Sequence, residues 1–182
     1  MLGVVADAAP HGGRHKGIVM RAIVVYESHW GNTAAVARAI AEGIGAETRV
    51  LSTAEATDSV VADAELIVAG APLLGFSLPT EAMVRGLERE ASPKPPDLGH
   101  PSMRAWLEAL PRASGRAAAF ETRIWWSPGS AAKAILERLE RAGYRSAAKP
   151  GRFVVKGRYG PLKEGELEKA RAWGAELARS AG

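Results

Sequence analysis

From residue 20 onward the chain alternates between short apolar runs and amphipathic segments. Residues 22–26 form a continuous apolar run, which is typical of a strand buried on both faces of a sheet. Further strands are expected at residues 48–51, 66–70, 117–120 and 153–155. Helices with one apolar face are expected at 33–42, from Pro79 onward with Met83 and Leu87 inward, and at 102–110, 130–142 and 164–180. This alternation predicts an α/β fold with a parallel sheet covered by helices on both faces, in three layers.

Two segments depart from the alternation. Residues 1–19 show no periodicity, and we expect them to form a disordered leader that precedes one domain at residues 20–182. Residues 91–101 contain four prolines. We expect an extended connector there rather than a domain boundary, because the alternation of strands and helices continues on both sides.

The composition excludes several classes of function. The chain has no cysteine, which excludes disulfides, thiol catalysis, iron–sulfur clusters and cysteine-bound zinc. No apolar run approaches the roughly 18 residues of a membrane span, and the first residues lack the pattern of a secretory signal, so a cytoplasmic protein is expected. The net charge is +4, but basic and acidic residues are interleaved. Nucleic-acid binding typically needs a concentrated basic stripe, and we expect no nucleic-acid partner.

Candidate binding residues follow three of the expected strands, because ligands of open parallel sheets bind beyond the carboxyl ends of the strands. The candidates are Ser28, His29, Trp30, Gly31, Asn32 and Thr33 in the first loop, Pro72, Leu73, Leu74, Gly75 and Phe76 in the second, and Thr122, Arg123, Ile124, Trp125 and Trp126 in the third. Around Gly31, small and hydroxyl residues can direct backbone N–H groups toward an anion at a helix N-terminus. Capping of that helix by Asn32 or Thr33 is the structural alternative.

Aromatic residues are concentrated in these loops. The loops hold Trp30, Trp125 and Trp126, three of the five tryptophans, and Phe76, one of the three phenylalanines. A flat aromatic ligand stacked between the loops explains their presence in segments that are normally polar. Packing onto the core or contact with a partner protein is the alternative explanation.

Several other functions need motifs that the chain lacks. No Gly-x-Gly-x-x-Gly follows the first strand, and there is no Walker A sequence. A phosphoacceptor receiver needs more acidic residues after its first strand than Glu27 supplies, and an Asp at the end of its third. His29 and His100 lack the acid and nucleophile signals of a hydrolase triad. We expect His29 to be a loop residue near a bound phosphate or ring edge.

Residues 25–33, Val-Tyr-Glu-Ser-His-Trp-Gly-Asn-Thr, resemble the phosphate loop of the flavodoxin family, Thr/Ser-x-Thr-Gly-x-Thr. Ser28, Gly31 and Thr33 match this loop, and Trp30 departs from it. More narrowly, the chain resembles bacterial flavodoxin-domain proteins that carry Phe-Asp-Thr-Arg and Gly-Pro-Leu-x-x-Gly-Glu. These segments are Phe-Glu-Thr-Arg at 120–123 and Gly-Pro-Leu-Lys-Glu-Gly-Glu at 160–166. The similarity covers residues 21–180.

The resemblance implies a flavodoxin-like fold with the strand order 2-1-3-4-5 and FMN as the cofactor. It places the FMN phosphate on residues 28–33 and the flavin ring between residues 71–76 and 122–126, with Gly75 near flavin N5. Relatives carry Pro-Thr-His where this chain has Pro72-Leu73-Leu74, which removes two polar groups and predicts weakened or retuned flavin binding. Typical flavodoxins are strongly acidic, whereas this chain is basic.

Three functions agree with these expectations. FMN-dependent electron transfer to a redox partner protein is the first. The second is an NAD(P)H-dependent FMN reductase that acts on quinones or similar small substrates and needs an open ring face. The third is a flavin-free binding module that keeps the fold, which the apolar Leu73-Leu74 favours. For electron transfer no side chain needs to act as a general acid or base, and we expect no catalytic residue and no metal site.

Overall fold

The computed structural model describes residues 20–181, and the leader expected at residues 1–19 lies outside them. The strands are β1 (Ala22–Tyr26), β2 (Arg49–Ser52), β3 (Leu66–Pro72), β4 (Gly115–Ile124), β5 (Tyr144–Ser146) and β6 (Gly151–Val155). The helices are α1 (Asn32–Ile44), α2 (Asp58–Ala62), α3 (Glu81–Gly86), α4 (Met103–Ala109), α5 (Ala131–Arg141) and α6 (Glu166–Ala181), with a short 3₁₀ turn, η1 (Leu87–Arg89).

All paired strands run parallel, and the sheet has the order β2-β1-β3-β4-β5. The fifth position is shared by two short strands, because β5 pairs with the start of β4 and β6 pairs with its end. Pro150 lies between them and lacks the amide donor that a sheet ladder needs. The expected parallel sheet with the order 2-1-3-4-5 is therefore confirmed, with its last position divided in two.

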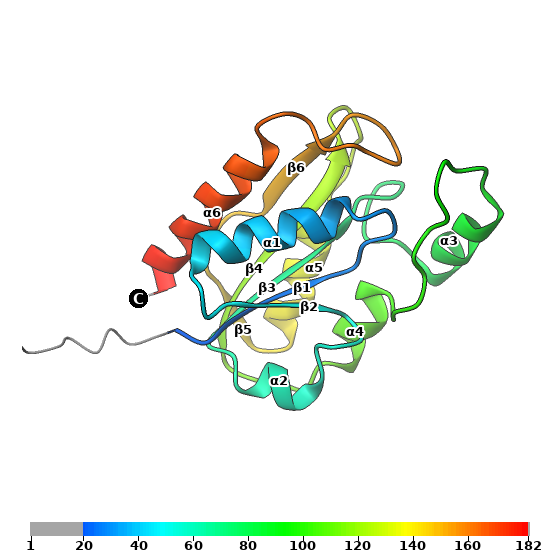
Figure 1. Ribbon diagram of the computed structural model, residues 1–182. Helices are drawn as coiled ribbons and strands as arrows, with labels where there is room; N and C mark the ends of the chain where they lie inside the picture. The colour runs from blue at the N-terminus through cyan, green and yellow to red at the C-terminus, as the bar shows by residue number, and fades with distance from the viewer. Residues whose placement is uncertain (1–19, 182) are drawn as a thin grey trace, which may run out of the picture.

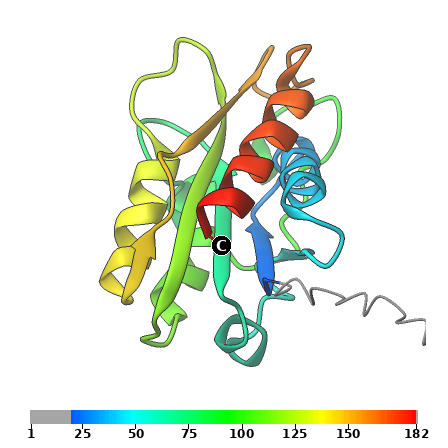
Figure 2. The same cartoon turned by 90° about the vertical axis from the view of Figure 1, so that its left-hand side faces the viewer.

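Helices cover both faces of the sheet, with α1 and α6 on one face and α4 and α5 on the other (Figure 1 and Figure 2). Alternate residues of each strand point to opposite layers. Val24, Val68 and Phe120 belong to the apolar cluster under α1 and α6, whereas Val25 and Ala69 belong to the cluster under α4 and α5. The three-layer arrangement follows from central strands, β1 and β3, that are apolar at every position.

Several boundaries differ from the expected ones. β4 continues past Phe120 to Ile124 because its last residues pair with β3 on one side and β6 on the other. Thr122, Arg123 and Ile124 are therefore strand residues, and the expectation that they form a loop is wrong. Met83 was expected to face inward but is 38% exposed, whereas Leu87 is buried. α2 and β5 were not expected from the sequence, and the connector at 91–101 has the expected irregular conformation.

No helix among the described residues has the length and hydropathy needed to cross a membrane.

Candidate functional site

The loop between β1 and α1 turns sharply at the carboxyl edge of the sheet. Gly31 precedes the helix with a φ of 91°, a left-handed conformation that glycine adopts without strain. Its amide donates to Ser28 Oγ at 3.1 Å, which closes the turn. No side chain caps α1. Asn32 instead donates from Nδ2 to the Tyr159 carbonyl oxygen at 3.1 Å, so the capping alternative does not describe Asn32 or Thr33.

Two buried hydroxyl groups meet behind this loop. Thr33 Oγ1, in the first turn of α1, lies 2.8 Å from Thr122 Oγ1 near the end of β4. Either oxygen can be the donor of the hydrogen bond, and only one of the two hydroxyl protons is needed for it. The second proton is available for a ligand acceptor. The first turn of α1 adds the positive end of the helix dipole, so this point favours an anion.

A small pocket opens beside the two hydroxyls, with a volume of about 60 Å³. It is lined by Ser28, His29, Trp30, Asn32, Thr33, Pro72, Leu73, Leu74, Thr122, Arg123, Ile124, Val155 and Arg158. This pocket holds a group the size of a few water molecules, which suits a phosphate but not a ring system.

A larger cleft of about 640 Å³ adjoins the small pocket. Its lining is mostly apolar and consists of Leu73, Leu74, Gly75, Phe76, Met83, Gly86, Leu87, Glu90, Ile124, Trp126, Ser127, Pro128 and Arg158. The two pockets share Leu73, Leu74, Ile124 and Arg158, so they form one continuous depression. The volume of the cleft is in the range that small-molecule and cofactor sites occupy.

Hydrogen bonds between two loops fix the walls of the cleft. The β3–α3 loop makes a tight turn, with an antiparallel bridge between Leu74 and Ser77 and a φ of 69° at Gly75. The Ser130 amide donates to the Phe76 carbonyl oxygen at 3.2 Å, which ties this loop to the β4–α5 loop. The Phe76 and Trp126 side chains remain 74% and 64% exposed at the mouth of the cleft.

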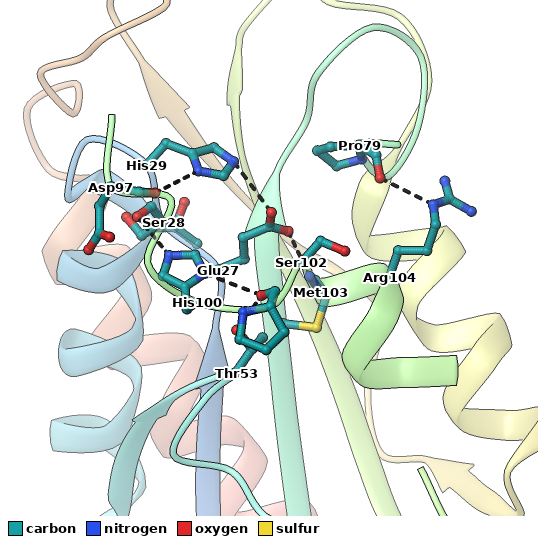
Figure 3. A network of polar contacts seen from close by, with 12 residues as sticks. Glu27, Ser28, His29, Thr53, Pro79, Asp97, His100, Ser102, Met103 and Arg104 are labelled. Atoms are coloured by element: carbon teal, nitrogen blue, oxygen red, sulfur yellow. Dashed lines mark hydrogen bonds and ion pairs between the residues drawn. The ribbon is translucent and has the colours of Figure 1, made fainter. Parts of the chain in front are cut away.

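A buried polar network lies under the β1–α1 loop and joins it to the connector (Figure 3). Glu27 Oε1 lies 3.4 Å from His29 Nε2, and both side chains are 1% exposed. His29 Nδ1 lies 3.2 Å from the Asp97 carbonyl oxygen, and the Asp97 amide donates back to the His29 carbonyl oxygen at 2.8 Å. The Met103 amide donates to Glu27 Oε2 at 2.9 Å. His100 stacks on the His29 ring with centroids 6.1 Å apart.

Trp30 and Tyr159 bind the other end of the connector through hydrogen bonds and contact each other. Trp30 Nε1 donates to the Lys94 carbonyl oxygen at 3.1 Å, and the Tyr159 hydroxyl donates to the Ala91 carbonyl oxygen at 3.0 Å. The two rings meet edge to face, with centroids 4.9 Å apart. Trp30 therefore occupies a structural position between the connector and the β6–α6 loop.

Flavodoxins are among the solved structures that match the chain. A flavodoxin from the domain Archaea matches with a TM-score of 0.63 and 24% identity, over 89% of this chain and 99% of its own. Flavodoxin 2 from Bacillus cereus matches with a TM-score of 0.60 and 15% identity, over 87% of this chain and 98% of its own. The two-electron reduced flavodoxin of Megasphaera elsdenii matches with a TM-score of 0.57 and 20% identity, over 87% of this chain and 98% of its own. The chain has the flavodoxin-like fold.

No protein-family model and no curated protein matches the chain by sequence.

The flavodoxin-like fold brings most of the selected residues together. Apart from Gly31 and Trp125, every one of them lines the small pocket, the cleft or both. Gly31 forms the turn before α1. Trp125 is 76% exposed and lines neither pocket.

One expectation about His29 needs correction. His29 was expected to lack a neighbouring acid, but Glu27 Oε1 lies 3.4 Å from His29 Nε2. Arg123 lines the small pocket, but its guanidinium pairs with the fully buried Glu121 at 2.8 Å. Glu121 also accepts from Ser130 Oγ and from the Ala132 amide, so it belongs to the start of α5 rather than to the pocket.

The sequence analysis missed several lining residues. Val155 and Arg158 reach the small pocket from the end of β6 and the loop that follows it. Their signal was present, since they follow a parallel strand at the same edge of the sheet. Met83, Leu87 and Glu90 reach the cleft from α3 and η1. No motif in the sequence marks these three positions.

Proposed function

We propose that the chain binds FMN in the small pocket and the adjoining cleft and transfers electrons to a redox partner protein. The observation that carries this proposal is the contiguity of the two pockets: a small pocket beside the Thr33 and Thr122 hydroxyls, at the N-terminus of α1, opens into an apolar cleft of aromatic-ligand size. The flavodoxin-like fold supports it, as does the resemblance of residues 28–33 to the flavodoxin phosphate loop.

The residues present fit a phosphate at one end. Thr33 and Thr122 have one hydroxyl proton to spare, and the first turn of α1 supplies a positive potential. The residues that would hold the phosphate are Ser28, Thr33 and Thr122. Thr33 and Thr122 are buried, which strengthens their interaction with a charged group.

The cleft fits a flat ring at the other end. Leu73 and Leu74 form one wall, and Ile124 and Trp126 form part of the other. When bound, FMN supplies the redox chemistry itself, and the protein tunes it through burial and hydrogen bonds near the ring. Because Leu73 and Leu74 are apolar, their side chains bury the ring without hydrogen-bonding to it. Backbone groups of the β3–α3 loop are left to provide the polar contacts.

Reconstitution with flavin tests the proposal. The purified chain is titrated with FMN and with riboflavin while absorbance and flavin fluorescence are recorded. We expect one FMN per chain, tighter binding of FMN than of riboflavin, and reversible reduction of the bound flavin by dithionite. A chain that binds neither flavin contradicts the proposal and supports the flavin-free binding module.

The open mouth of the cleft favours a second candidate, an NAD(P)H-dependent reductase for quinones or similar small substrates. Phe76, Met83 and Trp126 are exposed around the cleft, and a substrate has access to a ring bound there. Oxidation of NADH or NADPH by the FMN-loaded chain alone, with a quinone as acceptor, distinguishes this activity from electron transfer. An electron-transfer protein does not oxidise either nucleotide without a reductase.

A further inference from the structure

Arg158 lies at the junction of the small pocket and the cleft. It follows β6 and lines both cavities. Its Nη2 lies 2.6 Å from Glu90 Oε1, and the two side chains are 49% and 32% exposed. Glu90 lines the cleft but not the small pocket.

Two arginines line the small pocket, and they differ in what holds them. Arg123 is nearly buried and is committed to Glu121, which has no exposed surface. Arg158 makes one contact with a half-exposed carboxylate, through one of the five N–H groups of its guanidinium. Exposed ion pairs of this kind contribute little to stability, because solvent screens them. Arg158 is therefore the cation of this pocket that can change partner at little loss of stability.

We propose that Arg158 binds the phosphate of the ligand and makes the site selective for a phosphorylated flavin over an unphosphorylated one. The inference rests on the proposed function. On binding, the guanidinium exchanges Glu90 for phosphate oxygens, to which it donates charge-assisted hydrogen bonds. Glu90 is then a competitor: its carboxylate holds Arg158 in the free protein and repels a phosphate near the junction.

The loop that carries Arg158 is anchored independently of the Arg158–Glu90 pair. The neighbouring Tyr159 donates from its hydroxyl to the Ala91 carbonyl oxygen, and its own carbonyl oxygen accepts from Asn32 Nδ2. Its ring packs on Trp30. Because these contacts remain when Arg158 is substituted, a change in ligand binding reports the loss of the guanidinium rather than displacement of the loop.

The test compares dissociation constants for FMN and riboflavin in Arg158→Leu, Arg158→Lys and Glu90→Gln. We expect Arg158→Leu to weaken FMN about three- to tenfold and to change riboflavin less than twofold, because the guanidinium is partly exposed and its interaction is screened. Arg158→Lys should lie between wild type and Arg158→Leu. Glu90→Gln should tighten FMN about twofold, since it removes the competing charge. Added salt should reduce the FMN preference of wild type more than that of Arg158→Leu.

A matched control is available in Arg171→Leu. Arg171 pairs with Glu42 at the same 2.6 Å, is 45% exposed, and lines neither pocket. This variant should leave both dissociation constants unchanged. If wild type prefers FMN and Arg158→Leu keeps that preference, the inference is overturned while the proposed function stands. If wild type binds neither flavin, the proposed function and this inference are both overturned.

Discussion

The Glu27 and His29 side chains face each other under the β1–α1 loop, and both are 1% exposed. The Asp97 carbonyl oxygen can only accept a hydrogen bond, so His29 Nδ1, 3.2 Å away, carries a proton. On the other side of the ring, Nε2 faces Glu27 Oε1 at 3.4 Å. Neither Nε2 nor Oε1 makes a hydrogen bond to any other group among residues 20–181, so the two polar atoms are buried facing each other.

Substitution of Glu27 tests the structural role of this pair. Glu27→Gln keeps an oxygen for the Met103 amide and places an amide donor toward His29 Nε2. We expect its free energy of unfolding to stay within about 1 kcal/mol of wild type. Glu27→Leu removes the acceptor of the Met103 amide and the carboxyl group that faces His29 Nε2, and should lose about 3 kcal/mol. Urea denaturation measures both. Equal stability of the two variants would show that the pair does not hold the connector.

Substitution of Thr33 tests the phosphate pocket, because a lost phosphate contact changes the ratio of FMN to riboflavin affinity and a loss of folding stability does not. FMN and riboflavin differ only by the phosphate, so Thr33→Ala should weaken FMN about ten- to a hundredfold and leave riboflavin unchanged, as a lost hydrogen bond to a charged group costs roughly 1.5–3 kcal/mol. Thr33→Ser keeps the hydroxyl that contacts Thr122 and serves as the control. An unchanged FMN-to-riboflavin ratio with a lower melting temperature would assign Thr33 a purely structural role.

The parts of the fold that the sequence predicted well are those with a continuous apolar signal. β1 begins and ends at the expected residues, since all five positions are apolar and packed between two layers. β4 was expected to end at Phe120 because Glu121, Thr122 and Arg123 are polar. Tertiary partners satisfy these side chains, with Glu121 bonded to the start of α5 and Thr122 bonded to Thr33. Polarity alone could not reveal those partners.

The residues of the candidate site also fall into those that the sequence could predict and those that it could not. Residues after β1, β3 and β4 could be selected because parallel strands bring their carboxyl ends to one edge. The cleft-lining residues of α3 and η1 could not be selected from the sequence, because no sequence pattern marks the contacts through which this segment reaches the cleft. Arg104 of α4 donates to the Leu78 and Pro79 carbonyl oxygens and so ties the segment before α3 to α4.

The two adjacent tryptophans of the β4–α5 loop should respond differently to FMN. Trp126 lines the cleft, whereas Trp125 is 76% exposed and lines neither pocket. We expect FMN to quench tryptophan emission, and Trp126→Phe to remove more of that quenching than Trp125→Phe does. The measurement is a fluorescence titration of each variant with FMN. Equal losses in the two variants would contradict the assignment of Trp126 to the ring cleft.

Gly174 permits the close approach of α6 to α1. A Cβ at this position would collide with the Ile40 carbonyl oxygen, so Gly174→Ala should force the helices apart. We expect a loss of about 1–3 kcal/mol in the free energy of unfolding, in spite of the higher helix propensity of alanine. Gly86 of α3 has open space at the Cβ position, and Gly86→Ala is the matched control that should be neutral or slightly stabilising. Equal urea midpoints for the two variants would show that the helix contact tolerates a methyl group.

Tyr144, at the start of β5, should make the folded protein less stable at alkaline pH. It is 3% exposed, and its hydroxyl has no hydrogen-bond partner among residues 20–181. Burial raises the pKa of Tyr144 above its ordinary value of 10.0. Above about pH 10 the unfolded chain releases this proton while the folded chain keeps it, so the free energy of unfolding falls as pH rises from 10 toward the folded pKa.

Tyr144→Phe removes both the unpaired hydroxyl and the titration. We expect the variant to be about 1 kcal/mol more stable than wild type at pH 8, and this advantage to grow above pH 10. Urea denaturation at a series of pH values measures the difference. Stability curves that stay parallel above pH 10 would show that Tyr144 titrates equally in the folded and unfolded states.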